Sequence, residues 1–254
     1  MRKPIYELKA VAVGESVELS WLKSTPMFAA KEEEEFGRIR IYRREEQFVF
    51  GEDYEEYFLN MDPSGCEVVF DGSLEPMNRR KYVFVDGAAS VGRTYTYWIQ
   101  TRNSAPVGPV PVRLRDPEVW WSYQKMMRRL EALRDAAPGL VELSVCGRTT
   151  RGLDIPCVRV GTGRLAMGLV GALHGGESGP ELIVPVLSRL VKENPNLLRE
   201  VRVVALPSVN IDSREDEVRG APWYIRTNPA GVDLNRNFPP QWEQVEYGYG
   251  LDTS

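Results

Sequence analysis

The first 116 residues alternate apolar and polar side chains with a period of two, which is typical of β-strands that bury one face. The alternation is clearest at residues 17–21 (VELSW), which follow a turn at Gly14 and Glu15. Further strands are predicted at residues 38–42, 82–85, 94–101 and 107–114. Turn sequences rich in Asp, Gly and Pro separate the runs. Residues 1–116 are therefore predicted to form an all-β sandwich.

Two long stretches of this half, residues 24–37 and 47–78, do not continue the alternation clearly. We predict that both are loop insertions between strands.

The pattern changes after Asp116, a residue suited to cap a helix, and Pro117, which suits a first helical turn. Apolar residues then recur at helical spacing up to about residue 137. Strands are predicted at residues 141–145, 155–160, 165–172 and 201–206, with a helix at about 179–193. Strands that alternate with helices indicate α/β structure. Residues 117–254 are therefore predicted to form an α/β domain.

Composition excludes several classes of protein. The 254 residues carry a formal net charge of −4, which argues against nucleic-acid binding. No apolar run is long enough to predict a membrane span, and no apolar segment follows Met1 to indicate a signal peptide. The cytoplasm is then the default location. The three cysteines form no CxxC pair, so neither a disulfide framework nor a zinc knuckle is predicted.

The only histidine, His174, follows an apolar run and precedes Glu177 by three residues, with two glycines between them. Imidazole nitrogen and carboxylate oxygen are both good Zn²⁺ ligands, and a catalytic zinc requires three protein ligands and an open position for water. The alternative is that His174 makes a local backbone hydrogen bond while Glu177 is stabilised by the dipole of the helix that follows.

A second polar cluster lies in residues 226–239, a loop-like run rich in Asn, Pro and Gly. Asn235 and Arg236 are adjacent, and a guanidinium beside an amide is a good receptor for a carboxylate. Arg226 stands nine residues before Asn235 and can enter the same site. The alternative is a surface turn with solvated arginines.

Together these segments resemble the zinc carboxypeptidases of the M14 type. The resemblance covers about residues 117–254 and rests on CGRTTRGLDIPCVRV, GALHGGESGPE and RTNPAGVDLNRNFP. It implies that His174 and Glu177 are zinc ligands and that Arg226 polarises the scissile carbonyl and stabilises the oxyanion. It also implies that Asn235 and Arg236 grip the terminal carboxylate of a peptide or protein substrate.

The first half resembles a fibronectin type III domain. The resemblance rests on VELSW and on GRTYTYWIQTRNSAPVGPV. It implies that Trp21 packs between two sheets and that Tyr95 forms a tyrosine corner. A protein or a glycan is the kind of partner that such a domain would bind.

The carboxypeptidase resemblance is incomplete, and it implies that residues 117–254 form an incomplete mixed sheet flanked by helices. In that family a second His completes the zinc site and a later Glu is the general base, and a Tyr closes over the substrate. His174 is the only His in the sequence. Glu243 and Glu246 follow Asn235 and Arg236, the predicted carboxylate clamp, too closely to match the family's general base. We therefore expect the chain as given to be a fragment that is inactive by itself. A shortened inactive relative and a partner chain that completes the site are the alternatives.

Three functions remain open at this point. The first is a zinc metallocarboxypeptidase in full-length form. The second is an amidohydrolase of the same fold that removes acyl groups from amino acids, and the third is a non-catalytic binding protein. The carboxypeptidase resemblance also allows a location outside cells. We further expect residues 117–254 alone to be poorly soluble or marginally stable, because lost strand pairing leaves backbone groups unpaired.

Overall fold

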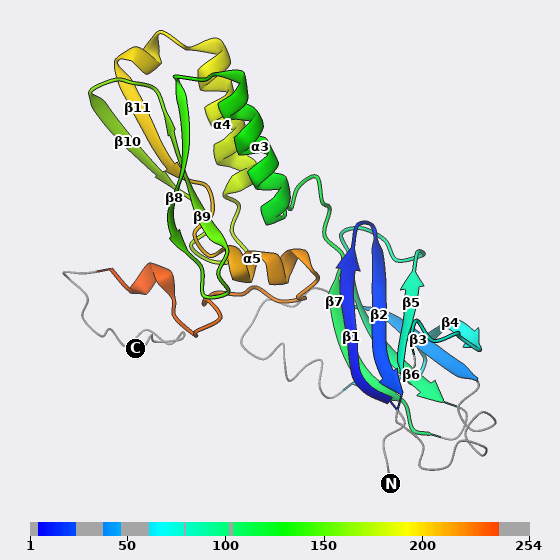
Figure 1. The fold of residues 1–254 in the computed structure, drawn as a ribbon. Coiled ribbons are helices and arrows are strands. Elements are labelled where there is room, and N and C mark those ends of the chain that lie inside the picture. Colours follow the sequence, from blue (N-terminus) through cyan, green and yellow to red (C-terminus); the bar gives the residue numbers. More distant parts are fainter. Residues whose placement is uncertain (1–4, 24–37, 47–60, 79, 102–103, 239–254) are drawn as a thin grey trace. The chain divides into compact units, whose positions relative to one another are not determined.

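A computed structural model describes residues 5–23, 38–46, 61–78, 80–101 and 104–238 of the chain (Figure 1). The chain divides into two compact units. The first comprises residues 1–116 together with Arg219–Trp223, and the second comprises residues 117–218 and 224–254.

The first unit contains two antiparallel sheets (Figure 1). One has the strand order β1 (Ile5–Val13), β2 (Ser16–Lys23), β5 (Lys81–Asp86). The other has the order β4 (Glu67–Gly72), β3 (Ile39–Glu46), β6 (Thr94–Thr101), β7 (Val107–Arg113). Alternate side chains of both sheets are buried in one cluster, which includes Val17, Leu19, Trp21, Ile39, Ile41, Tyr95, Tyr97, Ile99 and Val112. The alternation in the sequence thus places one face of each sheet in a shared core.

The predicted strands of this half are confirmed at every run, with small shifts at the ends. The prediction that residues 47–78 form a loop is wrong for residues 67–72, which form β4 beside β3. Ion pairs support this edge strand, because Asp71 accepts hydrogen bonds from Arg38 (2.5 Å) and Arg40 (2.9 Å). Residues 24–37 and 47–60 lie outside the described residues.

A buried carboxylate, Asp86, joins the two sheets of the first unit. It accepts hydrogen bonds from the hydroxyl of Tyr97 (2.8 Å), from Arg43 (2.8 Å) and from the backbone N–H of Ala88 (3.0 Å). Burial and the bond to Asp86 raise the pKa of the Tyr97 hydroxyl well above its usual range. Both oxygens of the carboxylate thus accept hydrogen bonds, which offsets the cost of burying this group.

The segment Arg219–Trp223 bridges β1 and β7 in this unit. The carbonyl of Arg219 accepts a hydrogen bond from Ala12 (2.7 Å), and that of Gly220 accepts one from Arg113 (2.8 Å). Gly220 has φ +113°, and a Cβ there would lie 2.5 Å from Val112 Cγ2. Glycine is therefore required at this position.

The second unit contains a mixed sheet with two helices on one face (Figure 1). The strand order is β10 (Leu165–Val170), β11 (Val201–Leu206), β9 (Asp154–Val160), β8 (Val141–Arg148). Strands β10 and β11 are parallel and the other pairs are antiparallel. Helices α3 (Tyr123–Ala136) and α4 (Pro180–Glu193) share a core with the strands, formed by residues that include Met126, Leu130, Val158, Val184, Leu187 and Val203. A single turn of 3₁₀ helix, η2 (Leu197–Arg199), precedes β11.

The predicted α/β pattern of this half is confirmed, but the first helix begins later than residue 117. Ser122 caps α3, because its hydroxyl accepts a hydrogen bond from the N–H of Lys125 (3.2 Å). The N–H of Trp121 is bound instead by the carboxylate of Glu181 (2.6 Å). This bond holds the backbone before Ser122 outside the helix, so the Asp116 cap is not used.

The helix α5 (Ile211–Val218) was not predicted from the sequence. Apart from Ile211, the buried residues of this helix are polar: Asp212, Ser213, Arg214 and Glu217. Among the described residues, none of the helices combines the length and apolar character that a membrane crossing requires.

Candidate metal and substrate site

The turn after β10 carries His174 and Glu177, and it leads directly into α4. Glycines allow this turn to lie against its neighbours. A Cβ on Gly175 would lie 2.8 Å from the backbone carbon of Ser213, and one on Gly176 would lie 2.1 Å from Cδ2 of Tyr224. Both distances are too short for any other residue, so the sequence of the turn is fixed by its packing.

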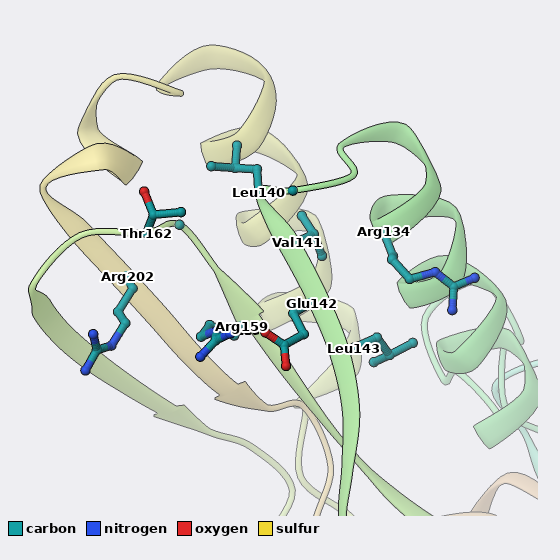
Figure 2. A pocket seen from close by; sticks show the side chains of 10 residues that line it. Arg134, Leu140, Val141, Glu142, Leu143, Arg159, Thr162 and Arg202 are labelled. Carbon is teal, nitrogen blue, oxygen red and sulfur yellow. Dashed lines mark hydrogen bonds and ion pairs between the residues drawn. The ribbon is translucent and has the colours of Figure 1, made fainter.

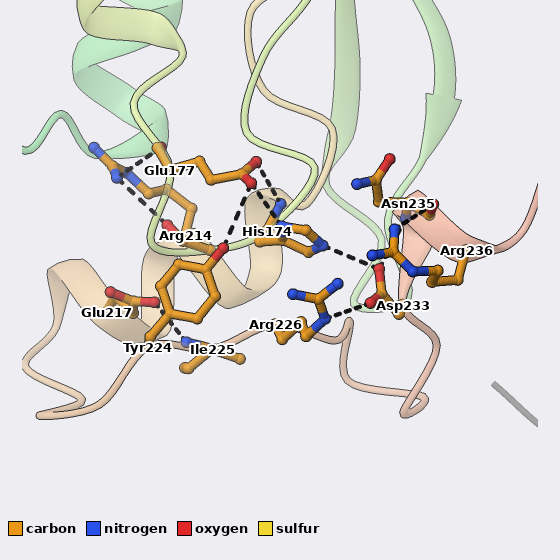
Figure 3. Close-up of polar contacts among 11 residues, drawn as sticks. His174, Glu177, Arg214, Glu217, Tyr224, Ile225, Arg226, Asp233, Asn235 and Arg236 are labelled. Atoms are coloured by element: carbon orange, nitrogen blue, oxygen red, sulfur yellow. Dashed lines mark hydrogen bonds and ion pairs between the residues drawn. The ribbon is translucent and has the colours of Figure 1, made fainter. Parts of the chain in front are cut away.

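The structure brings the side chains of His174 and Glu177 together (Figure 3). His174 Nδ1 lies 2.6 Å from Glu177 Oε1, and the backbone N–H of His174 donates to Oε2 (3.1 Å). Partial burial acts to raise the pKa of Glu177, but these bonds from His174 outweigh it and lower the pKa. The carboxylate is therefore ionised and faces the imidazole.

Asp233 is a site residue that sequence reasoning missed. It is fully buried, and its Oδ1 lies 3.0 Å from Nε2 of His174. Its Oδ2 accepts a hydrogen bond from Nε of Arg226 (2.5 Å). Burial acts to raise the pKa of Asp233, but the bonds from His174 and Arg226 lower it. The available signal was its place as the one carboxylate in residues 226–239.

Asp233 thus joins Arg226 to His174, and two of the predicted elements meet through it (Figure 3). Asn235 and Arg236 follow on a single 3₁₀ turn, η3 (Leu234–Arg236), where both are exposed. The N–H of Asn235 donates to Asp233 Oδ1 (3.0 Å), and Arg236 donates to the carbonyl of Asn235 (3.1 Å). The predicted carboxylate clamp lies beside the His174 turn, with its polar groups facing solvent.

Helix α5 supports the segment that carries Arg226. Glu217 accepts a hydrogen bond from the N–H of Ile225 (2.7 Å), and the hydroxyl of Ser213 donates to the carbonyl of Thr227 (2.7 Å). Directly before Ile225, the hydroxyl of Tyr224 donates to Glu177 Oε1 (3.4 Å). Burial raises the pKa of Tyr224 to about 12, so this hydroxyl keeps its proton and remains a donor.

The described residues contain no cluster of three or more His, Cys, Asp or Glu side chains arranged for a metal ion. His174 and Glu177 provide two donors of the kind that zinc prefers, and a catalytic zinc requires a third.

A cavity of about 570 Å³ lies at the opposite end of the strands (Figure 2). It is lined by residues that include Arg134, Glu142, Arg159 and Arg202. The predicted site residues do not line it.

Comparisons with known proteins indicate one family. The model of the zinc carboxypeptidases, peptidase M14, matches residues 126–252, which is half of the chain. The carboxypeptidase N catalytic chain of Homo sapiens is 29% identical over 137 residues, which are 46% of this chain and 30% of that protein. Carboxypeptidase Z of Rattus norvegicus is 30% identical over 161 residues, which are 56% of this chain and 24% of that protein.

The chain thus spans less than a third of the length of these curated relatives. Among solved structures, a metallo-carboxypeptidase from Pseudomonas aeruginosa in complex with (2-guanidinoethylmercapto)succinic acid is similar at 17% identity and a TM-score of 0.39. That match covers 86% of this chain and 51% of the other.

Proposed function

This chain belongs to the zinc carboxypeptidase family, and we propose on that premise that the full-length protein removes C-terminal residues from peptides or proteins. One observation carries the proposal. The imidazole of His174 lies between the carboxylates of Glu177 and Asp233, and Asp233 also holds Arg226 (Figure 3). One buried carboxylate thus holds a proposed metal donor, His174, and a cation for substrate, Arg226.

His174 and Glu177 are the residues that we propose as zinc ligands. The donor types fit zinc, because an imidazole nitrogen and a carboxylate oxygen are both good zinc donors and here lie 2.6 Å apart on one turn. With a metal at Nδ1 in place of the contact to Glu177, Nε2 would donate its proton to Asp233, which would fix the ring. When bound, zinc polarises a water molecule and the scissile carbonyl. We propose that the third ligand and the general base come from beyond the described residues.

Arg226 is the proposed stabiliser of the oxyanion. Its Nε is bound to Asp233, and the structure records no bond of its other N–H groups to a described residue, so these groups can donate to a substrate carbonyl. A fixed donor aimed at developing negative charge stabilises the transition state more than the substrate.

Asn235 and Arg236 are the proposed receptor for the substrate's terminal carboxylate. An arginine donates two parallel hydrogen bonds to a carboxylate, and an amide adds a third donor. An internal peptide bond has no carboxylate to offer, so this clamp selects chain ends.

The test uses the full-length protein and matched peptides with a free or an amidated C-terminus. We expect hydrolysis of the free peptide alone, loss of activity with a chelator, and recovery with zinc. Cleavage of N-acyl amino acids without cleavage of peptides would instead indicate an amidohydrolase. Zinc-independent substrate binding without hydrolysis would indicate a binding protein.

We also propose that residues 1–116 are a fibronectin III-like sandwich that precedes the catalytic domain at residues 117–254. The strand orders β1-β2-β5 and β4-β3-β6-β7 support this proposal. Trp21 is 2% exposed and stacks on Tyr82, with ring centroids 5.9 Å apart. The hydroxyl of Tyr95 accepts a hydrogen bond from the N–H of Ser90 (2.9 Å), five residues upstream, as in a tyrosine corner.

A further inference from the structure

Arg214 is a buried cation beside the proposed zinc ligands that the proposed function does not use. It belongs to α5 and is 3% exposed. One terminal nitrogen, Nη1, donates to the backbone carbonyls of Glu177 (3.2 Å) and Gly175 (3.4 Å). Figure 3 shows the guanidinium on the opposite side of Glu177 from His174.

The guanidinium of Arg214 is itself held in place from two other directions. Its second terminal nitrogen, Nη2, forms an ion pair with Glu181 in the first turn of α4. Its Cζ lies 4.2 Å from the ring centroid of Trp120, a cation–π contact. A planar group with a charge partner on one edge and an aromatic ring on its face has one orientation.

The turn that Arg214 binds has little rigidity of its own. Residues 174–179 (HGGESG) include three glycines, and glycine leaves the backbone more freedom than any other residue. The two carbonyls that Arg214 binds belong to Gly175, which follows His174, and to Glu177 itself. Fixing both carbonyls fixes the directions in which the His174 and Glu177 side chains leave the backbone.

We propose that Arg214 is a positioning residue that holds His174 and Glu177 in the arrangement in which their donor atoms converge. The proposal rests on the proposed function of this pair as zinc ligands. The same helix also binds the Arg226 segment through Ser213 and Glu217. Helix α5 therefore sets the spacing between the ligand turn and the segment that carries Arg226.

The single histidine makes a direct test possible in the full 254-residue chain. The imidazole ¹H–¹⁵N spectrum contains the signals of one residue, and zinc binding is followed on the same signals. The variants are Arg214→Met, which removes the guanidinium and all its N–H donors, and Arg214→Lys, which keeps the positive charge and one donor group. The matched control is Arg189→Met on α4, where the arginine is exposed and pairs with Glu193.

For Arg214→Met, we expect broadened or multiple His174 signals without metal. We also expect zinc affinity about 10-fold weaker, the scale found when an outer partner of a metal ligand is removed. Arg214→Lys recovers part of both effects, and Arg189→Met changes neither. A purely structural arginine would alter the unfolding midpoint and leave the His174 signals of the folded protein unchanged.

Removing Arg214 leaves Glu181 as a largely buried carboxylate without its ion-pair partner, which can prevent folding. The double variant Arg214→Met with Glu181→Gln removes both charges and keeps the test decisive. A folded double variant with wild-type His174 signals and wild-type zinc affinity would overturn the proposal. The metal-free spectra decide the role of Arg214 without zinc, so failure of this proposal is distinguishable from failure of the zinc role of His174, which the chelator test on the full-length protein decides.

Discussion

Asp233 uses its two carboxylate oxygens for different partners, the imidazole of His174 and the guanidinium of Arg226. An acidic side chain would repel the substrate carboxylate that this segment is predicted to bind. The sequence alone therefore indicated Asn235 and Arg236 as site residues and not Asp233. Its burial resolves the contradiction. Asp233 faces inward, where it orients His174 and Arg226, whereas Arg236 on the next turn is exposed to solvent.

Gly176→Ala tests whether the turn is packed as described. The added Cβ would lie 2.1 Å from Tyr224 Cδ2, so the ring or the turn must move, and overpacking typically costs about 1–3 kcal/mol. We expect a lower midpoint in urea unfolding of the second unit. Gly168→Ala is the control, because nothing lies within 4 Å of a Cβ there. Equal midpoints for the two variants would contradict the described packing.

Tyr97→Phe tests the buried bond to Asp86 and its pH dependence. Loss of a hydrogen bond to a charged group costs about 1.5–3 kcal/mol near neutral pH. Since the pKa of Tyr97 is raised by burial and by Asp86, its contribution is fully present below the unfolded-state pKa, about 10. It is then lost as pH rises, by up to about 1.4 kcal/mol per pH unit.

The stability gap between wild type and Tyr97→Phe should therefore narrow above pH 10, as measured by urea unfolding across a pH series. The exposed Tyr6 provides the matched control as Tyr6→Phe. A gap that is constant up to pH 12 would show that Tyr97 ionises equally in the folded and unfolded chain.

At the scale of elements, the sequence predicts correctly the strands and helices whose buried face is apolar. Strands β2 and β6 were predicted because one face of each is apolar and buried. Helix α5 was missed because its buried face is polar, with Arg214 and Glu217 bonded to loops on either side. Strand β4 was missed because its stability comes from pairing with β3, which is distant in sequence.

Strand β10 is apolar at almost every position yet exposed along most of its length. Within the described residues it pairs on one edge only, with β11. Leu165 is 70% exposed, Met167 46% and Val170 57%. A continuous apolar run is typical of a strand buried on both faces, and such a strand with a free edge promotes association.

Met167→Lys should therefore reduce self-association of the chain, because a lysine on an edge strand opposes pairing with another chain. The measurement is light scattering at matched protein concentrations. Val119→Lys is the control, since Val119 is 59% exposed but lies outside the sheet. Equal scattering by the two variants would mean that the chain does not self-associate through β10.

At the scale of the whole molecule, the two units are not consecutive in sequence, because Arg219–Trp223 belongs to the first. A protein of residues 1–116 lacks the carbonyls that bind Ala12 and Arg113. We expect the amides of Ala12 and Arg113 to exchange hydrogen slowly in the full chain and much faster in residues 1–116. The amide of Leu19, in the central strand of its sheet, provides the internal control. Equal protection in the two proteins would contradict the bridge.

Residues 117–254 alone should show no cooperative thermal transition. Among their described residues, β10 pairs on one edge only, and they contain Arg219–Trp223 without the strands that bind this segment. Scanning calorimetry of this fragment is the measurement, and a sharp endothermic peak would refute the expectation.

The position of Arg219–Trp223 between β1 and β7 has a consequence for how the first unit can be passed between genes. A module that is exchanged between genes must be contiguous, whereas the first unit here includes five residues encoded after most of the second. Transfer of codons 1–116 alone would leave behind the residues between β1 and β7. Substitutions at Ala12, Val112 and Gly220 should therefore be correlated among relatives that carry both units, because a Cβ at Gly220 would meet both Val112 Cγ2 (2.5 Å) and Ala12 Cβ (3.5 Å).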